Sequence, residues 1–296
     1  MKNQSATLAD LFEQIDGILV INMDSSPERF AHFMSTVGVH LPAEKLERIS
    51  AVAGRELPSY GKGPWFTDKT GERARFWGGT GGCALSHRNA IAHARGKGWR
   101  NVLIFEDDVC LEASDDAIPL ITEVLKNRTG AYLFYAGYNK PAPRGKVIAR
   151  NGGAAVWRTD GVIAAHAYIV SSELYEPLLN AFPANDDDIW EWLAKYRAVD
   201  VLYRDFVPHW PGVSVYVLDP ILFHQRDGVS DIGLNAAEGV EVANRMTPRK
   251  LKGWKKLLNK MLIPLRRLKT RLNSLRTYYR ASTQGLPGYK KKRKDR

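Results

Sequence analysis

The feature that most constrains this chain is a run of four apolar residues, 102–105, that ends in three consecutive carboxylates, Glu106, Asp107 and Asp108. The run has the length and the β-branched and aromatic content of a buried strand. The carboxylates then lie at the carboxyl end of that strand, where open α/β sheets bind ligands. Ionising three adjacent acids costs free energy unless a cation or protons offset it, and such hard oxygen ligands suit Mg²⁺ or Mn²⁺. The run therefore predicts a divalent-metal site that holds a substrate's phosphates, with a solvated acidic turn as the alternative.

Apolar segments alternate with helical patterns along residues 17–225, which favours an α/β fold with a mostly parallel central sheet flanked by helices. The opening unit is a buried strand over 18–23, a turn, and a helix from Pro27 to about Val37. The other expected elements are a helical lead-in within 1–16, strands within 46–52, 131–137, 162–170, 213–218 and 220–225, and helices over 84–94, 115–126, 172–180 and 186–196.

Two stretches between these elements are predicted to be loops. Residues 77–83 are rich in glycine and precede the helix over 84–94, so their backbone N–H groups are candidates for holding a phosphate. The glycines match neither the dinucleotide G-x-G-x-x-G pattern nor the G-K-[ST] P-loop, so this signal is weak by itself. Residues 138–160 hold polar residues, proline and glycine, which indicates a second loop.

The positive charge of the chain is concentrated in one segment. Residues 249–296 contain 18 of the 43 Lys and Arg residues but only one of the 32 Asp and Glu residues. This segment therefore carries a charge of about +17, and residues 1–248 carry about −6. Leucines and Trp254 recur there at helical spacing, which is typical of an amphipathic helix at an anionic membrane surface. We therefore expect a catalytic domain over 1–246 and a C-terminal basic amphipathic helical tail over 247–296. Nucleic-acid binding, or packing of the tail on the body, are the alternatives.

The cysteines and the apolar segments restrict the class of protein further. Cys83 and Cys110 form neither a disulfide framework nor a zinc spacing, and free thiols suit a reducing compartment. The first ten residues carry no apolar signal-peptide region, and no stretch of about 18 apolar residues occurs. The expectation is a cytoplasmic protein without a spanning helix.

Four blocks of the chain together resemble glycosyltransferase family 25, the lipopolysaccharide-core and collagen galactosyltransferase family. They come in the family's order and cover roughly residues 17–233. The most specific is Gly-Cys-Ala-Leu-Ser-His at 82–87 followed by Ile-Phe-Glu-Asp-Asp-Val at 104–109. The other blocks are 20–29, 166–171, and 199–200 with 220–222 and 230–232. One departure from the family is Gly79-Thr80-Gly81, where a glutamate usually precedes the Gly-Cys pair.

The resemblance implies a GT-A-like fold and transfer of a sugar, most often galactose, from a UDP-sugar to an acceptor hydroxyl. It implies that Asp108 binds Mn²⁺ or Mg²⁺ directly, that Asp107 contacts the metal and the sugar or ribose, and that Glu106 lies behind them on the donor side. His224, which ends an apolar segment, is a candidate for completing the metal's ligands, with an ordinary strand-end histidine as the alternative.

The remaining candidates are a general base and contacts to the donor. Inverting transfer needs a base on the acceptor hydroxyl. Asp200, at the family's Val-Asp position, is the first candidate, and Asp188 is a weaker one because it also suits a helix N-terminus. The residues expected to bind the donor are Asn22, Arg29, Ser86, His87 and His166. For Arg29 the alternative is a solvated surface arginine, and for the two histidines it is a structural role.

Together these inferences predict that the protein is a metal-dependent glycosyltransferase that acts on the lipopolysaccharide or lipooligosaccharide core. Its expected partners are a UDP-sugar, a lipid-linked oligosaccharide acceptor and an anionic membrane surface, with the protein peripheral on the cytoplasmic face of a bacterial inner membrane. One alternative keeps the fold with a protein or capsule acceptor. The other is a catalytically silent membrane or nucleic-acid adaptor that acts through the tail. The sequence leaves open the donor sugar, the linkage, the choice between Mn²⁺ and Mg²⁺, and the oligomeric state.

Overall fold

The structure is a computed structural model that describes residues 7–58, 60, 71–112, 114–139, 145–226 and 272, without the side chains of 71–76, 190 and 194. The expected domain boundary at 246 and the basic tail over 247–296, Leu272 excepted, lie outside the described residues, as does the block at 230–232.

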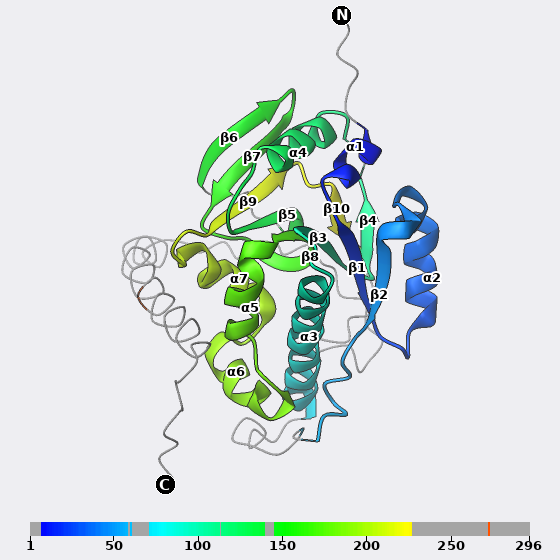
Figure 1. The fold of residues 1–296 in the computed structure, drawn as a ribbon. Helices are drawn as coiled ribbons and strands as arrows, with labels where there is room; N and C mark the ends of the chain where they lie inside the picture. Colours follow the sequence, from blue (N-terminus) through cyan, green and yellow to red (C-terminus); the bar gives the residue numbers. More distant parts are fainter. Residues whose placement is uncertain are drawn as a thin grey trace, which may run out of the picture.

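A mixed eight-stranded sheet has the order β2-β1-β3-β8-β5-β9-β7-β6, and β10 and β4 form a separate pair (Figure 1). The pairs β1/β2, β1/β3 and β5/β9 are parallel, and the other neighbours in the large sheet are antiparallel. The predicted α/β class with a central sheet is confirmed. The strands are β1 (Gly17–Asn22), β2 (Leu46–Ser50), β3 (Asn101–Glu106), β4 (Val109–Leu111), β5 (Tyr132–Asn139), β6 (Gly145–Asn151), β7 (Ala154–Thr159), β8 (Ile163–Ser171), β9 (Ser214–Asp219) and β10 (Phe223–Gln225).

Helices cover both faces of the sheet (Figure 1). Helices α3, α5, α6 and α7 pack on one face, and α1, α2 and α4 pack on the other. Their bounds are α1 (Leu8–Glu13), α2 (Pro27–Thr36), α3 (Gly71–Gly96), α4 (Ala117–Lys126), α5 (Tyr175–Ala181), α6 (Ile189–Tyr196) and α7 (Val199–Asp205), with short 3-10 turns η1 (Gly38–His40), η2 (Ala43–Lys45), η4 (Ser172–Leu174), η5 (Asp186–Asp188) and η6 (Val207–His209).

The central strands read as continuous apolar runs because they are buried on both faces. In β1, Leu19 and Ile21 enter the core beneath α3, whereas Ile18 and Val20 enter the core beneath α2 and α4. Successive strand residues point to opposite faces, so a strand covered by helices on both sides needs apolar residues at every position. β1 and β3 are therefore interior strands near the β2 edge of the sheet, and their carboxyl ends are left for polar residues.

The prediction of a glycine-rich loop over 77–83 was wrong, because these residues lie within helix α3. Glycine lowers helix propensity, but here it permits contacts that a side chain would block. A Cβ at Gly82 would lie 2.3 Å from the carbonyl oxygen of Val52, and a Cβ at Gly54 would lie 1.8 Å from that of Gly78. The glycines therefore let the backbone of residues 52–54 pack directly against the helix.

The prediction of a loop over 138–160 was also wrong for most of its length. Within it, β6 and β7 form an antiparallel hairpin at the sheet edge. The turn consists of Gly152 and Gly153, with φ +49° at Gly152, and Asn151 precedes it. Gly-Gly is one of the dipeptides favoured in a two-residue hairpin loop, so the sequence did contain a signal for this hairpin.

Among the helices that the structure describes, none combines the length and the hydrophobicity needed to cross a lipid bilayer.

The close approach at Gly82 makes a stability prediction. Gly82→Ala places a methyl group against backbone atoms of residues 52–54, which cannot rotate away, so the free energy of unfolding should fall by about 1–3 kcal/mol despite the gain in helix propensity. The measurement is urea denaturation followed by circular dichroism. Gly96→Ala, at the end of the same helix, meets no atom within 4 Å and is the matched control. Equal stability of the two variants would contradict the packing account.

Candidate functional site

The three carboxylates occupy a turn at the edge of the central sheet. Glu106 is the last residue of β3, and Asp107 and Asp108 form the turn that leads into β4. Two contacts hold the end of the turn that leads into β4. β4 pairs antiparallel with β10, and the Arg226 N–H donates to the Asp108 carbonyl at 2.7 Å. All three carboxylates line a cavity of about 310 Å³. Residues at the carboxyl ends of β1, β2 and β3 contribute to its walls, as the strand-end argument predicts.

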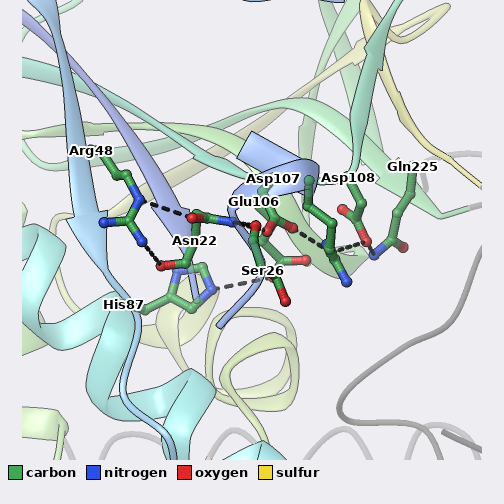
Figure 2. A network of polar contacts seen from close by, with 9 residues as sticks. Asn22, Ser26, Arg48, His87, Glu106, Asp107, Asp108 and Gln225 are labelled. Atoms are coloured by element: carbon green, nitrogen blue, oxygen red, sulfur yellow. Dashed lines mark hydrogen bonds and ion pairs between the residues drawn. The ribbon is translucent and has the colours of Figure 1, made fainter. Parts of the chain in front are cut away.

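Asp107 is buried and is held by partners from β1 and α2 (Figure 2). The Asn22 amide donates to its Oδ2 at 2.7 Å, and the Arg29 guanidinium contacts its Oδ1. Asn22 is in turn oriented by Arg48, whose Nε donates to the Asn22 Oδ1 at 2.8 Å. Burial raises the pKa of Asp107, although Arg29 and the Asn22 hydrogen bond oppose the shift. Both oxygens of this carboxylate are therefore committed within the protein.

Asp108 has fewer partners. Gln225 donates to its Oδ2 at 3.0 Å (Figure 2). Arg29 Nη2 lies 3.5 Å from the same oxygen. Its Oδ1 is buried and has no hydrogen-bond partner. Burial and the negative charge of Glu106 raise the pKa of Asp108 to about 7. A buried oxygen atom with an unsatisfied lone pair, on a residue that lines the cavity, fits a cation that the protein alone does not supply.

Glu106 is linked to a buried chain of hydroxyl groups. Its Oε1 lies 3.3 Å from Nε2 of His87 on α3, and Nδ1 of His87 lies 2.6 Å from the Tyr168 hydroxyl. The Tyr168 hydroxyl lies 3.3 Å from that of Tyr203. Burial raises the pKa of Glu106, but the hydrogen bond and charge of His87 outweigh that effect, so the pKa is lowered overall. Glu106 is thus the carboxylate of the turn that ionises most readily.

Two residues on α3 complete this part of the cavity wall. Ser86 donates to the Gly82 carbonyl at 2.7 Å and accepts the Val52 N–H at 2.8 Å, so it joins the helix to the segment after β2. Cys83 lies one helical turn before His87, and its Sγ, a ring nitrogen of His87 and a Glu106 oxygen all lie within 4.8 Å of one another. Burial and the charge of Glu106 raise the pKa of the Cys83 thiol.

The structure brings seven of the predicted site residues to the cavity and leaves four outside its walls. Those that line it are Asn22, Arg29, Ser86, His87, Glu106, Asp107 and Asp108. Those that do not are His166, Asp188, Asp200 and His224.

Two of the outlying residues have local partners. His224 is 45% exposed, and its Nδ1 lies 3.7 Å from Glu112 Oε2. Asp188 is exposed in η5, where its N–H donates to the Asn185 side chain. That position is typical of a helix start.

Of the other two, His166 is buried and Asp200 is partly buried. His166 Nε2 donates to the Phe223 carbonyl at 3.1 Å, and burial lowers its pKa, so the ring is neutral at pH 7. Asp200, on the first turn of α7, accepts the backbone N–H of Ala164, which has a left-handed φ of 82°. Burial and the negative charge of Glu106 raise the pKa of Asp200.

Sequence reasoning missed Gln225, Cys83 and the backbone of residues 52–54. His224 was chosen at the end of the last apolar segment, but Gln225 faces the cavity, because adjacent strand residues point to opposite sides. The pairing of β10 with β4 decides whether His224 or Gln225 faces the cavity, and this pairing cannot be seen in the sequence. Cys83 lies four residues before His87, a helical spacing that becomes visible only once 77–83 is recognised as helix.

The raised pKa of Asp108 predicts how stability depends on pH in metal-free buffer. The folded state holds a proton on Asp108 up to about pH 7, whereas the unfolded state loses it near 3.8, so stability should fall as pH rises from 4 to 7. Asp108→Asn removes this contribution, on the order of a few kcal/mol, and keeps an acceptor for Gln225. Thermal melts at pH 5 and pH 8 with EDTA should show a smaller loss of Tm in the variant. The exposed Asp160→Asn is the control, and a variant curve parallel to the wild type would refute the account.

Comparison with known proteins gives one result for the chain as a whole and one for its N-terminal part. No curated protein sequence matches the chain. Residues 15–140, from the start of β1 to the end of β5, match the family model described as Glycosyltransferase family 25 (LPS biosynthesis protein). The matched segment contains the acidic turn, Asn22, Arg29 and His87. The resemblance seen in the sequence is therefore confirmed over residues 15–140, and this match to family 25 indicates a glycosyltransferase of lipopolysaccharide biosynthesis.

Proposed function

We propose that the chain transfers a sugar, galactose in the first instance, from a UDP-sugar to a hydroxyl of a lipopolysaccharide or lipooligosaccharide core acceptor, with inversion and with a divalent metal. The observation that carries the proposal is the acidic turn, Glu106 to Asp108. Its three carboxylates line a cavity, and the turn lies within the segment that matches family 25. The cavity volume of about 310 Å³ lies at the lower end of the range usual for small-molecule sites.

The donor's diphosphate would bind near the acidic turn. Arg29 supplies positive charge there, because its guanidinium contacts Asp107 and lies 3.5 Å from Asp108. Asn22 and Ser86 line the same cavity at the ends of β1 and on α3. A guanidinium placed between two carboxylates and an open cavity is suited to orient an anionic ligand.

A divalent cation fits Asp108 better than Asp107. Asp108 offers a buried Oδ1 without a partner, whereas the oxygens of Asp107 are engaged by Asn22 and Arg29. Asp108 would hold Mn²⁺ or Mg²⁺, with Asp107 beside it. Such a cation supplies charge compensation for the leaving diphosphate. His224 is left out of this proposal because it pairs with Glu112 outside the cavity wall.

Asp200 is the proposed general base. Its carboxylate is fixed by the N–H of Ala164, and its raised pKa makes it a stronger proton acceptor than an exposed aspartate. The negative charge of Glu106 influences it, so the two carboxylates lie in one electrostatic environment. The base would take the proton of the acceptor hydroxyl as the sugar bond forms. Asp188 is the weaker candidate because it is exposed in η5.

The proposal also includes the membrane. Residues 247–296, with their excess of Lys and Arg, would hold the enzyme on the anionic cytoplasmic face of the inner membrane, where a lipid-linked acceptor is present. The support for this part is the charge and the amphipathic spacing of the sequence.

Donor binding tests the site directly. Calorimetry with UDP-galactose should show binding that needs Mn²⁺ and that disappears in Asp108→Ala, because the variant removes the oxygen proposed to hold the metal. Asp160→Ala, an exposed aspartate outside the cavity wall, is the matched control and should bind as wild type does. Metal-dependent binding that survives in Asp108→Ala would refute the assignment of Asp108. Failure of the folded protein to bind any UDP-sugar would refute the proposed donor.

The choice of base is tested by kinetics. Asp200→Asn keeps an acceptor for the Ala164 N–H and should lower kcat by about 10²- to 10⁴-fold while leaving donor affinity unchanged. Asp188→Asn, in exposed η5, should change kcat little. A large loss of kcat in Asp188→Asn with little change in Asp200→Asn would instead assign the general base to Asp188. Loss of donor affinity in Asp200→Asn would instead show that Asp200 binds the donor.

A further inference from the structure

We propose that Cys83, His87 and Glu106 form a binding site for Zn²⁺ or a similar soft divalent cation, with a fourth ligand position that opens to the cavity. This site is distinct from the one proposed at Asp108, and the argument for it holds whether or not the donor is a UDP-sugar.

The spacing of the three ligand atoms suits one ion. Cys83 and His87 are four residues apart on α3, so their side chains share a face of the helix. Both lie close to Glu106 at the end of β3. The three ligand atoms lie within 4.8 Å of one another, and His87 Nε2 lies 3.3 Å from Glu106 Oε1. Two ligands of a tetrahedral zinc ion are separated by ~3.3–3.6 Å. The imidazole and the carboxylate are already at that separation, and the thiol needs only a small movement.

Tyr168 orients the histidine from behind. Its hydroxyl lies 2.6 Å from Nδ1 of His87, on the side of the ring opposite Glu106, and also contacts the Tyr203 hydroxyl. A metal-binding histidine usually has such a partner on its second nitrogen, which fixes the ring and the tautomer. When Nε2 binds an ion, the Tyr168 hydroxyl can accept a hydrogen bond from Nδ1–H, and it can donate its own hydrogen to the Tyr203 hydroxyl.

The chemistry of the ligands separates this site from the carboxylate turn. Thiolate and imidazole ligands favour Zn²⁺ and related ions, whereas the oxygens of Asp107 and Asp108 favour Mg²⁺ or Mn²⁺. One thiolate and one carboxylate would balance the charge of a divalent ion. All three proposed ligands line the cavity, so a fourth ligand, water or a substrate hydroxyl, would come from the cavity side. Three protein ligands and one open position are the pattern of a reactive zinc site and not of a purely structural one.

Cobalt absorption tests this proposal, because Co²⁺ replaces Zn²⁺ and reports thiolate ligation by a charge-transfer band. The metal-free full chain should show this band when Co²⁺ is added, and Zn²⁺ should displace it. The chain has two cysteines, so the band should persist in Cys110→Ser, where Cys83 is the remaining thiol, and should be absent in Cys83→Ser. Tyr168→Phe should weaken Zn²⁺ binding by about 10- to 100-fold.

The controls separate this site from the donor site and from misfolding. Asp108→Asn should keep the cobalt band, because Asp108 is not one of the three ligands. The band in the Cys110→Ser protein assigns the thiolate without any change at Cys83, so the test does not depend on the folding of Cys83→Ser. Absence of a band in wild type, or loss of the band in Cys110→Ser, would overturn the proposal. Calorimetry with UDP-galactose and Mn²⁺ is a separate readout, so failure of one proposal leaves the other measurable.

Discussion

Three adjacent carboxylates on one buried turn impose the main physical constraint on this structure. Each has to be compensated separately, and each partner comes from a different element. His87 on α3 contacts Glu106, Asn22 on β1 and Arg29 on α2 contact Asp107, and Gln225 on β10 contacts Asp108. A charge that is buried without a partner is costly, so the turn orders these four elements around itself. Polar contacts therefore join α2, α3 and β10 to this edge of the sheet in addition to their apolar packing.

The mixed topology of the sheet explains why the site lies where it does. The strands β2, β1 and β3 are parallel and end together at the cavity, whereas β8, next to β3, runs in the opposite direction. The cavity therefore lies beside the boundary between parallel and antiparallel strands. β8 begins at Ile163 and pairs Ala167 with Phe105, so it extends past the end of β3. His166 therefore lies inside β8, where it is buried and donates to the Phe223 carbonyl.

The sequence predicted the parts of the fold that depend on local pattern. The apolar run 102–105 is a buried strand, and the carboxylates after it do reach a cavity with Asn22 and Arg29. It could not predict what depends on pairing across the chain. The inward position of Gln225 follows from the register of β10 with β4, a contact between residues more than a hundred positions apart. The helix through residues 77–83 depends on a backbone contact with Gly54, and glycine content taken alone indicates a loop.

The backbone packing between α3 and residues 52–54 has a consequence for how substrates are distinguished. On this side the cavity is lined by residues 51–56, which follow β2, and by Gly79, Cys83, Ser86 and His87 of α3, and the Ser86 side chain joins the two segments. The segment and the helix meet through main-chain atoms at Gly54 and Gly82, so the absence of a side chain at these two glycines sets how closely they approach. A side chain added at Gly82 would therefore push the segment after β2 away from the helix and change the shape that a ligand meets, although Gly82 does not itself line the cavity.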